Sequence, residues 1–361
     1  ISESQGMVQS LLKTNTIPTD LQRFLQDKVE GNPFYIEEVI NSLIESETLK
    51  SENGRWQVTR KITEAEISST IHGLISGRLD RLEKESKRIL LEASVIGRTF
   101  FYEILNRITE LNQQVDSSLR SLERLDLIRT RAMQPDLEYI FKHALTQEVV
   151  YNGLLRKERR VIHERIGRVI EQLFHDRKPE FYETLAYHFL QGESHLKAAD
   201  YLMKSGAKSL KRYSLDEAHQ YFKEAYEVLN DLPDKTIEEK KLIIGIILEW
   251  ALVFYYSCDV KGWKKIFDDH EELAKSIGDE EKLAMYYAWH GFVFLGDDNR
   301  KAINLVQKAL ELGEKLENEK IIAYACTWLT WICDDLGLFH VGLIFGARAQ
   351  KISKNVESDH Y

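Results

Sequence analysis

Two segments, ELAKSIGDEEKLAMYYAWHG at residues 272–291 and ELGEKLENEKIIAYACTWLT at 311–330, align without a gap when one is shifted by 39 residues. They share two Glu, one Leu, one Ala and one Trp, and Trp250 continues the Trp spacing one period towards the N-terminus. A fixed period of about 20–50 residues is typical of arrays in which each unit buries its apolar face against the next. The spacing therefore predicts a stack of helical repeats over residues 178–361.

Each unit is expected to end with a second helix, and residues 299–317 give its clearest pattern. Small residues recur on one face of this helix and permit close approach of a neighbouring helix; the face consists of Ala302, Val306, Ala309, Gly313 and Leu316. Such alternating helices resemble tetratricopeptide (TPR) repeats, whose period is about 34 residues, although the units here run 39–40 residues. No capping helix is evident at the end of the sequence, so we expect the natural protein to continue.

The composition is that of a globular protein, with 43% apolar and 30% charged residues. Its net charge of −9 is uneven, because residues 78–177 hold 19 Lys and Arg against 16 Asp and Glu. Three cysteines do not make a disulfide framework and no signal peptide is visible, so we expect a reducing, cytoplasmic location. The apolar run at 242–256 is short for a membrane span and contains Glu249, so we predict a buried helix and no membrane partner.

Two further domains are predicted before the repeats. Residues 1–70 begin with a small helical bundle over 1–50 and contain RWQVT at 55–59, which is expected to be a short strand or an extended link. Residues 71–177 show helical patterns at 71–82, 84–96, 112–125, 144–154 and 156–174, with β-prone stretches at 126–132 and 137–143. Three helices followed by a two-stranded hairpin are the arrangement of a winged helix. The expected fold is therefore mainly α, with a winged-helix domain between the N-terminal helices and a TPR-like α-solenoid.

The common catalytic motifs are missing from the sequence. It contains no G-x-x-x-x-G-K-[ST], no G-x-G-x-x-G, no H-E-x-x-H and no Cys/His cluster at zinc spacing. Cys326 and Cys333 are seven residues apart on one predicted helix face, which indicates core packing rather than redox chemistry. We therefore expect no catalytic residue and no metal site in this chain, and do not expect it to be an enzyme by itself.

Four stretches, taken in this order, carry a resemblance to one family of signalling proteins. They are GNPFYIEEVINSLIESETL (31–49), LISGRLDRLEKESKRILLEASVIGRTF (74–100), LERLDLI (122–128) and YIFKHALTQEVVYNGLLRKERRVIHERI (139–166). Together they resemble the end of the AAA+-like nucleotide-binding module of signal-transduction ATPases with numerous domains (STAND). More narrowly, they are similar to the ATPases joined to class III adenylyl/guanylyl cyclases, to Ser/Thr kinases or to bacterial transcription activators.

This resemblance implies that residues 1–70 are the end of the helical lid of an ATPase. The Walker A and Walker B segments would then lie upstream of Ile1, in a part of the protein that this chain lacks. The parent protein would bind ATP or ADP, whereas the chain alone would hold no cofactor. Its nucleotide-facing residues would contact the missing ATPase core within the same molecule.

Gly31 and Pro33 match the Gly-x-Pro motif that ends the lid in this family, where the proline packs against the adenine of the nucleotide. Glycine lacks the Cβ that would block the approach, and proline presents a rigid apolar surface to a purine. The alternative is purely local: Asn32 would cap a helix that Pro33 begins, since proline suits the first helical turn. Both interpretations predict a helix that starts at this point.

His143, in FKHALTQEVVY, resembles the histidine of the family's Met-His-Asp element, which reaches the β-phosphate of ADP. An imidazole can donate a hydrogen bond to an anion. Phe141, Lys142 and Ala144 depart from the pattern, because neither its Met nor its Asp is present. The alternative is a histidine that caps the helix following a strand.

The segment RKERRVIHER at 156–165 contains five Arg or Lys: Arg156, Lys157, Arg159, Arg160 and Arg165. A basic helix beside a winged helix raises the alternative of a DNA-binding transcription regulator. However, Glu158 and Glu164 dilute its charge, and VDSSLRSLERLDL (115–127), which covers most of the recognition-helix position at about 112–125, has two arginines and three acids. We therefore expect a solvated helix face or an intramolecular contact, and not a nucleic-acid partner.

Taken together, these features predict a regulatory fragment of a nucleotide-switch ATPase. The winged helix would couple the nucleotide state to the repeat array, and the array would bind a protein partner or an effector domain. Nucleotide held at Gly31, Pro33 and His143 would favour a closed form, and a partner on the array would favour an open one.

Overall fold

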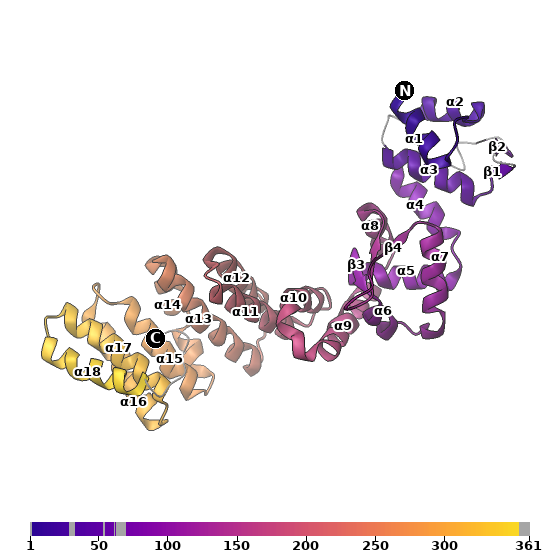
Figure 1. Cartoon of the computed structure of the whole chain (residues 1–361). Helices are drawn as coiled ribbons and strands as arrows, with labels where there is room; N and C mark the ends of the chain where they lie inside the picture. Colours follow the sequence, from indigo (N-terminus) through magenta and orange to yellow (C-terminus); the bar gives the residue numbers. More distant parts are fainter. Residues whose placement is uncertain (1, 29–32, 53–54, 61, 63–69, 354–361) are drawn as a thin grey trace. The chain divides into compact units, whose positions relative to one another are not determined.

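The computed structural model describes residues 2–28, 33–52, 55–60, 62 and 70–353 (Figure 1). The chain forms two compact units, Ile1–Leu173 and Phe174–Tyr361. The division within the first unit, which we predicted between residues 70 and 71, stays a prediction.

Three helices and a hairpin open the first unit: α1 (Ser2–Leu12), α2 (Thr19–Lys28), α3 (Pro33–Glu45), β1 (Leu49–Glu52) and β2 (Arg55–Val58). Their apolar side chains, among them Leu21, Val39 and Ile40, form one buried cluster. The predicted strand at 55–59 is confirmed, but the helical interpretation of residues 1–50 misses β1, which pairs antiparallel with β2. The Trp56 indole donates a hydrogen bond of 2.7 Å to the carbonyl oxygen of Leu12 and so fixes the hairpin to α1.

The rest of the first unit alternates helices with short strands. In chain order these are α4 (Ile71–Asp80), α5 (Lys84–Ile96), β3 (Thr99–Phe101), α6 (Tyr102–Ile108), η1 (Asn112–Gln114), α7 (Val115–Arg124), β4 (Ile128–Ala132), β5 (Glu138–Phe141), α8 (Ala144–Asn152) and α9 (Arg156–Leu173). Both predicted strands of the hairpin are present, with Thr130 opposite Tyr139.

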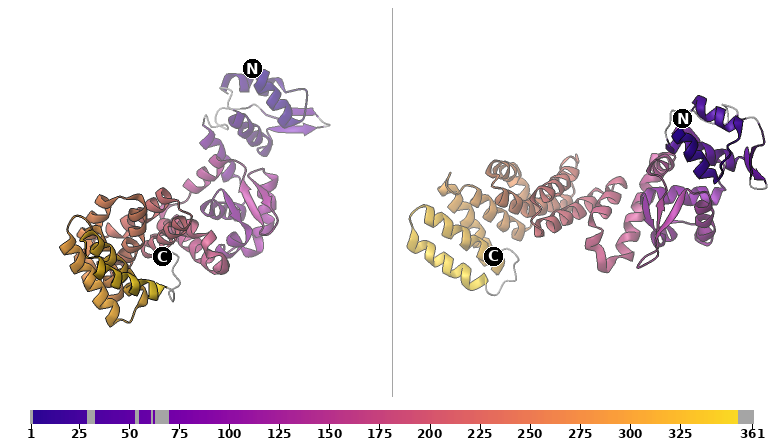
Figure 2. Two further views of the ribbon diagram at one scale, coloured as in Figure 1. Left: turned by 60° about the vertical axis from the view of Figure 1, so that its left-hand side comes forward. Right: turned by 45° about the horizontal axis from the view of Figure 1, so that its top comes forward.

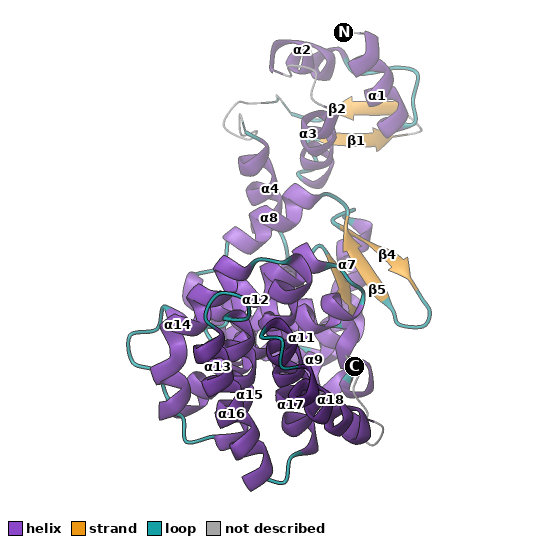
Figure 3. Ribbon diagram, turned by 90° about the vertical axis from the view of Figure 1, so that its left-hand side faces the viewer, coloured by secondary structure: helices purple, strands orange, loops and turns teal. Residues whose placement is uncertain are grey.

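The sequence-based prediction is incomplete here, because β3 and α6 lie between the second and third predicted helices. β3 pairs with β5, so the sheet is three-stranded in the order β3-β5-β4 (Figure 3). The Phe100 ring centroid lies 5.8 Å from those of Tyr139 and Phe141, which places an aromatic layer on this small sheet.

The second unit is an α-solenoid of TPR-like helix pairs (Figure 2). After η2 (His175–Glu180) it consists of α10 (Tyr182–Gln191), α11 (His195–Lys211), α12 (Leu215–Asn230), α13 (Ile237–Ser257), α14 (Val260–Ser276), α15 (Glu280–Val293), α16 (Asn299–Lys315), α17 (Glu319–Asp335) and α18 (Phe339–Ser353). Each helix packs most extensively against its neighbours in sequence.

The 39-residue period appears in the way the helices begin. The side chains of Asp279 and Asn318, one period apart, each accept a hydrogen bond from a backbone N–H at the start of α15 and α17. Asp259 and Asp298, again one period apart, cap α14 and α16 in the same manner. A cap satisfies an N–H group that the helix itself leaves unpaired.

The three periodic tryptophans are buried on the first helices of successive pairs. Trp250, Trp289 and Trp328 lie on α13, α15 and α17, and the last two ring centroids are 5.3 Å apart. The expected close approach at small residues is also confirmed, since a Cβ added to Gly313 would lie 2.9 Å from Cγ2 of Ile321.

The apolar run at 242–256 forms the greater part of α13, and most of its aliphatic side chains are buried, in agreement with the predicted buried helix. Within the described ranges, no helix combines the length and apolar character needed to cross a membrane.

Candidate functional site

The candidate site is the place where α3 begins and β5 gives way to α8. Pro33 is the first residue of α3 and is exposed, whereas Gly31 lies outside the described residues. His143 directly precedes α8. Phe34 follows Pro33, and its ring centroid lies 4.3 Å from that of His143. The structure therefore brings the surroundings of Pro33 and His143 together, although 110 residues separate these two positions.

His143 is held by its neighbours, but its Nε2 forms no hydrogen bond with any described residue. Its Nε2 lies 3.4 Å from Oε2 of Glu37, and this buried nitrogen has no hydrogen-bond partner within the described part of the chain. Burial lowers the pKa of His143, with Lys142 acting in the same direction and Glu37 opposing it. The imidazole is therefore neutral near pH 7 and can carry its proton on Nε2, where it would be a donor.

The side chain of His143 does not cap helix α8, which was the alternative role predicted for it. The residue occupies the N-cap position of α8 in an extended conformation, with φ −121° and ψ 138°. Its side chain nevertheless accepts no hydrogen bond from the first turn of that helix. The ring turns to Phe34 and Glu37 of α3 instead.

Lys142 connects three elements at this junction. Its ammonium group binds the carboxylates of Glu37 on α3 and Asp126 on the turn before β4. Only 11% of the lysine side chain is exposed, so solvent screens these contacts less than it screens surface ion pairs.

Arg78 of α4 forms the buried base of the junction. Its guanidinium donates to Oε2 of Glu38 at 2.7 Å, to both carboxylate oxygens of Glu45 and to the carbonyl oxygen of Leu125 at 2.7 Å. Burial lowers the pKa of Arg78, but Glu45 and Glu38 outweigh it and raise the pKa above its ordinary value. Breaking such a pair would leave an uncompensated buried charge, so the network holds α3 and α4 together.

The charge balance of the junction matters for any anionic ligand. Four carboxylates, those of Glu37, Glu38, Glu45 and Asp126, face three cations, Arg78, Arg129 and Lys142. An added phosphate would be repelled unless a carboxylate moved away or further cations were supplied. Glu37 is the carboxylate beside both Lys142 and His143.

At least two of the five cations in the basic segment of α9 make contacts within the protein. Arg165 donates a hydrogen bond of 2.6 Å to the carbonyl oxygen of Ile108, and the Arg159 guanidinium lies 4.7 Å from the centre of the Tyr151 ring. On α7, Arg120 and Arg124 are balanced by two acids, Asp116 and Glu123. The expectation that nucleic acid is not a partner stays a prediction.

Sequence reasoning named Pro33 and His143 as candidates but did not find the residues that lie between them. Glu37 lies one turn after Pro33 in the quoted Gly-x-Pro stretch, and its partner Lys142 is 105 positions away. Periodicity carries no signal for such a contact. Among the residues described, no group of three His, Cys, Asp or Glu is arranged to hold a metal ion.

Comparisons with known proteins give limited likenesses. A protein-family profile described as a domain of unknown function (DUF8739) matches residues 1–57. An uncharacterized protein of Rhizobium meliloti (strain 1021) is 25% identical over 201 residues, which are 54% of this chain. The match spans only 19% of that relative's length.

Two solved structures are similar over nearly the whole chain. One is a STAND protein with a tetratricopeptide repeat sensor from Pyrococcus horikoshii, with 15% identity, a TM-score of 0.37 and coverage of 97% of this chain and 59% of that one. The other is the apo form of RapI, with 13% identity, a TM-score of 0.44 and coverage of 94% and 77%.

Proposed function

We propose that this chain is a non-catalytic, regulatory part of a STAND-type nucleotide-switch ATPase. Residues 71–177 would be its winged helix, and the TPR-like array would bind a protein partner or an effector domain. The proposal rests on the contacts of Phe34 and Glu37 with His143, because they bring the start of α3, where Pro33 lies, next to the other position that resembles a nucleotide contact of the family.

The local chemistry supports a shared nucleotide site. Pro33 is exposed and offers a rigid apolar surface suited to an adenine. His143 has a buried Nε2 without a hydrogen-bond partner in the described ranges, which suits a phosphate oxygen. The phosphate-binding loop and the remaining cations would come from an ATPase core in the full-length protein. ATP or ADP would therefore bind between that core and this junction.

In this proposal the Glu37 carboxylate has two positions, one without nucleotide and one with a phosphate bound at His143. Without nucleotide, its carboxylate stays with Lys142 and His143. A phosphate at His143 would compete with Glu37 for the same positive side chain and the same ring nitrogen. ADP would thus favour a closed form of the full-length protein, and a partner on the array would favour an open form.

The winged-helix assignment rests on the order of elements from α5 to β5, with a helix and a strand, two helices and a two-stranded hairpin. In this proposal the domain works through contacts within the protein, because α7 carries as many acids as arginines. The output domain of the parent would be a nucleotide cyclase, a kinase or a transcription activator, in the cytoplasm.

The test is calorimetric titration of ADP into the full-length protein and three variants. Losing a hydrogen bond to a charged phosphate should weaken binding by about 10- to 100-fold in His143→Ala. Glu37→Gln should tighten binding, because it removes the competing charge. His72→Ala, at an exposed position of α4, is the matched control and should bind as the wild type does. Equal ADP affinity for the wild type and His143→Ala would show that the assignment is wrong.

A further inference from the structure

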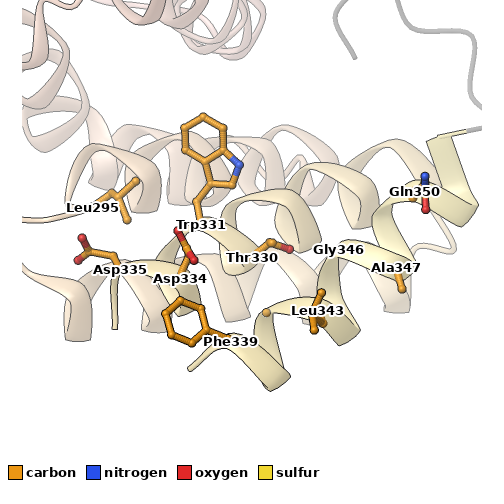
Figure 4. A pocket seen from close by; sticks show the side chains of 11 residues that line it. Leu295, Thr330, Trp331, Asp334, Asp335, Phe339, Leu343, Gly346, Ala347 and Gln350 are labelled. Carbon is orange, nitrogen blue, oxygen red and sulfur yellow. The ribbon is translucent and has the colours of Figure 1, made fainter. Parts of the chain in front are cut away.

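A groove of about 920 Å³ opens along α17 and α18, beside the end of α15 (Figure 4). Its apolar lining includes Leu295, Trp331, Phe339 and Leu343. The last three side chains are 44%, 62% and 70% exposed, respectively. Large apolar residues gathered in one concavity on a surface are typical of interaction sites.

The equivalent position in the preceding helix pair shows what such a groove can hold. One period before Trp331 lies Phe292 of α15, and that position is covered by α17. The Phe292 ring centroid lies 4.2 Å from that of Trp328 and 5.8 Å from that of Trp331. Because a helix fills the equivalent place in the preceding pair, the groove has the shape to accept a helix.

The charge of the groove differs from that of its counterpart. Asp334 stands one period after Leu295, so an acid replaces an aliphatic side chain. Asp335 accepts a hydrogen bond of 2.5 Å from Asn299, whereas Asp334 is exposed and forms no ion pair with any described residue. The helix that fills the counterpart, α17, has no Lys or Arg after Lys320. A repeat helix of that kind would therefore leave Asp334 without a cation.

We infer that this groove binds a basic amphipathic helix of a partner protein. The helix would place bulky apolar side chains against Trp331 and Leu343 and a Lys or Arg next to Asp334. Buried apolar anchors would supply most of the affinity, and the charge pair would select basic over acidic helices. The inference deepens the partner-binding role proposed for the array and does not depend on the nucleotide switch.

The test uses fluorescence anisotropy with the 361-residue chain. The probe is a labelled 18-residue peptide of Leu and Lys, patterned so that Leu covers one face of a helix; its twin has Glu for every Lys. The Lys peptide should bind saturably, and the Glu peptide about tenfold or more weakly. Asp334→Asn should reduce the difference in affinity between the Lys and Glu peptides.

Two neighbouring substitutions provide the matched control. Leu343→Gln should weaken binding of the Lys peptide about tenfold, as expected for an interface anchor. Ile344→Gln alters an equally exposed side chain (69%) on the same helix that does not line the groove, and should bind as the wild type does. Both substitutions are at exposed positions, and circular dichroism would check that the helices are retained.

Several results would overturn the inference. If the Lys and Glu peptides bound equally well, the proposed selection by charge would be wrong. If Leu343→Gln and Ile344→Gln weakened peptide binding equally, the groove would not be the binding site. Self-association that Leu343→Gln abolishes would show that a second copy is the occupant. Binding by the 361-residue chain but not by the full-length protein would show that the protein covers its own groove. ADP affinity is measured separately, so failure here is distinguishable from failure of the proposed switch.

Discussion

His163 of α9 is a single side chain whose charge the fold strongly opposes. It is 1% exposed, and its Nε2 lies 3.1 Å from the hydroxyl oxygen of Tyr151. Burial, helped by the positive charge of Arg159, lowers its pKa to about 4. The unfolded chain would keep the ordinary pKa of about 6.5. Between pH 4 and 6.5 the unfolded state binds more protons than the folded state does. The contribution of His163 to the free energy of unfolding is therefore fully present above about pH 6.5 and is lost as the pH falls towards 4.

We predict that lowering the pH from 7 to 5 costs the first unit about 2 kcal/mol of unfolding free energy through His163. His163→Gln keeps a polar partner for Tyr151 without titrating, so its unfolding free energy should lack this contribution. Urea unfolding at both pH values, with the wild type and the variant side by side, measures the difference. An identical pH dependence in the two proteins would contradict the assignment.

Only some residues of the candidate site could be predicted from the sequence. Pro33 and His143 could be named because each sits in a stretch that resembles a family motif. The structure adds Phe34 and Glu37, which meet His143 across 109 and 106 positions of sequence. Such contacts depend on how α3 packs in three dimensions, and no local spacing encodes them. Gly31 remains a prediction outside the described residues.

At the scale of helices, close crossings depend on positions without a side chain. A Cβ added to Gly291 of α15 would lie 2.5 Å from Cγ2 of Val306 and 3.0 Å from the carbonyl oxygen of Ala302, both on α16. A Cβ added to Gly245 of α13 would instead find its nearest atoms at 4.0 Å. The two glycines therefore offer a direct comparison within one unit.

We predict that Gly291→Ala destabilises the array by about 1–3 kcal/mol, because overpacking outweighs the better helix propensity of alanine. Gly245→Ala should be neutral or should stabilise it by up to about 1 kcal/mol, since only the propensity changes. Thermal unfolding of both variants followed by circular dichroism tests this. If the two alanines shift the midpoint equally, the crossing is not tightly packed.

The elements that sequence reasoning missed are the short ones. β3 has three residues and α6 has seven, which is too little for a helical or alternating period to appear. β1 shows one buried residue followed by three exposed ones, so it lacks the alternation of a half-buried strand. In the array, by contrast, the 39-residue period repeats the tryptophans and the caps, and each repetition strengthens the prediction.

For the whole molecule, the proposed switch and the groove belong to different units. The junction of α3, β5 and α8 lies in Ile1–Leu173, and the groove of α17 and α18 lies in Phe174–Tyr361. The central claim concerns the first: nucleotide acts at the contact between α3 and His143. If so, the amides of these elements should respond to ADP in the full-length protein.

Hydrogen–deuterium exchange of the full-length protein, with and without ADP, tests that claim most directly. We predict that ADP slows exchange in α3 and at the start of α8, because ligand binding to the folded state suppresses local opening. The slowing should disappear in His143→Ala at an ADP concentration that saturates the wild type. Unchanged exchange in both elements on adding ADP, or the same slowing in the wild type and His143→Ala, would contradict the account.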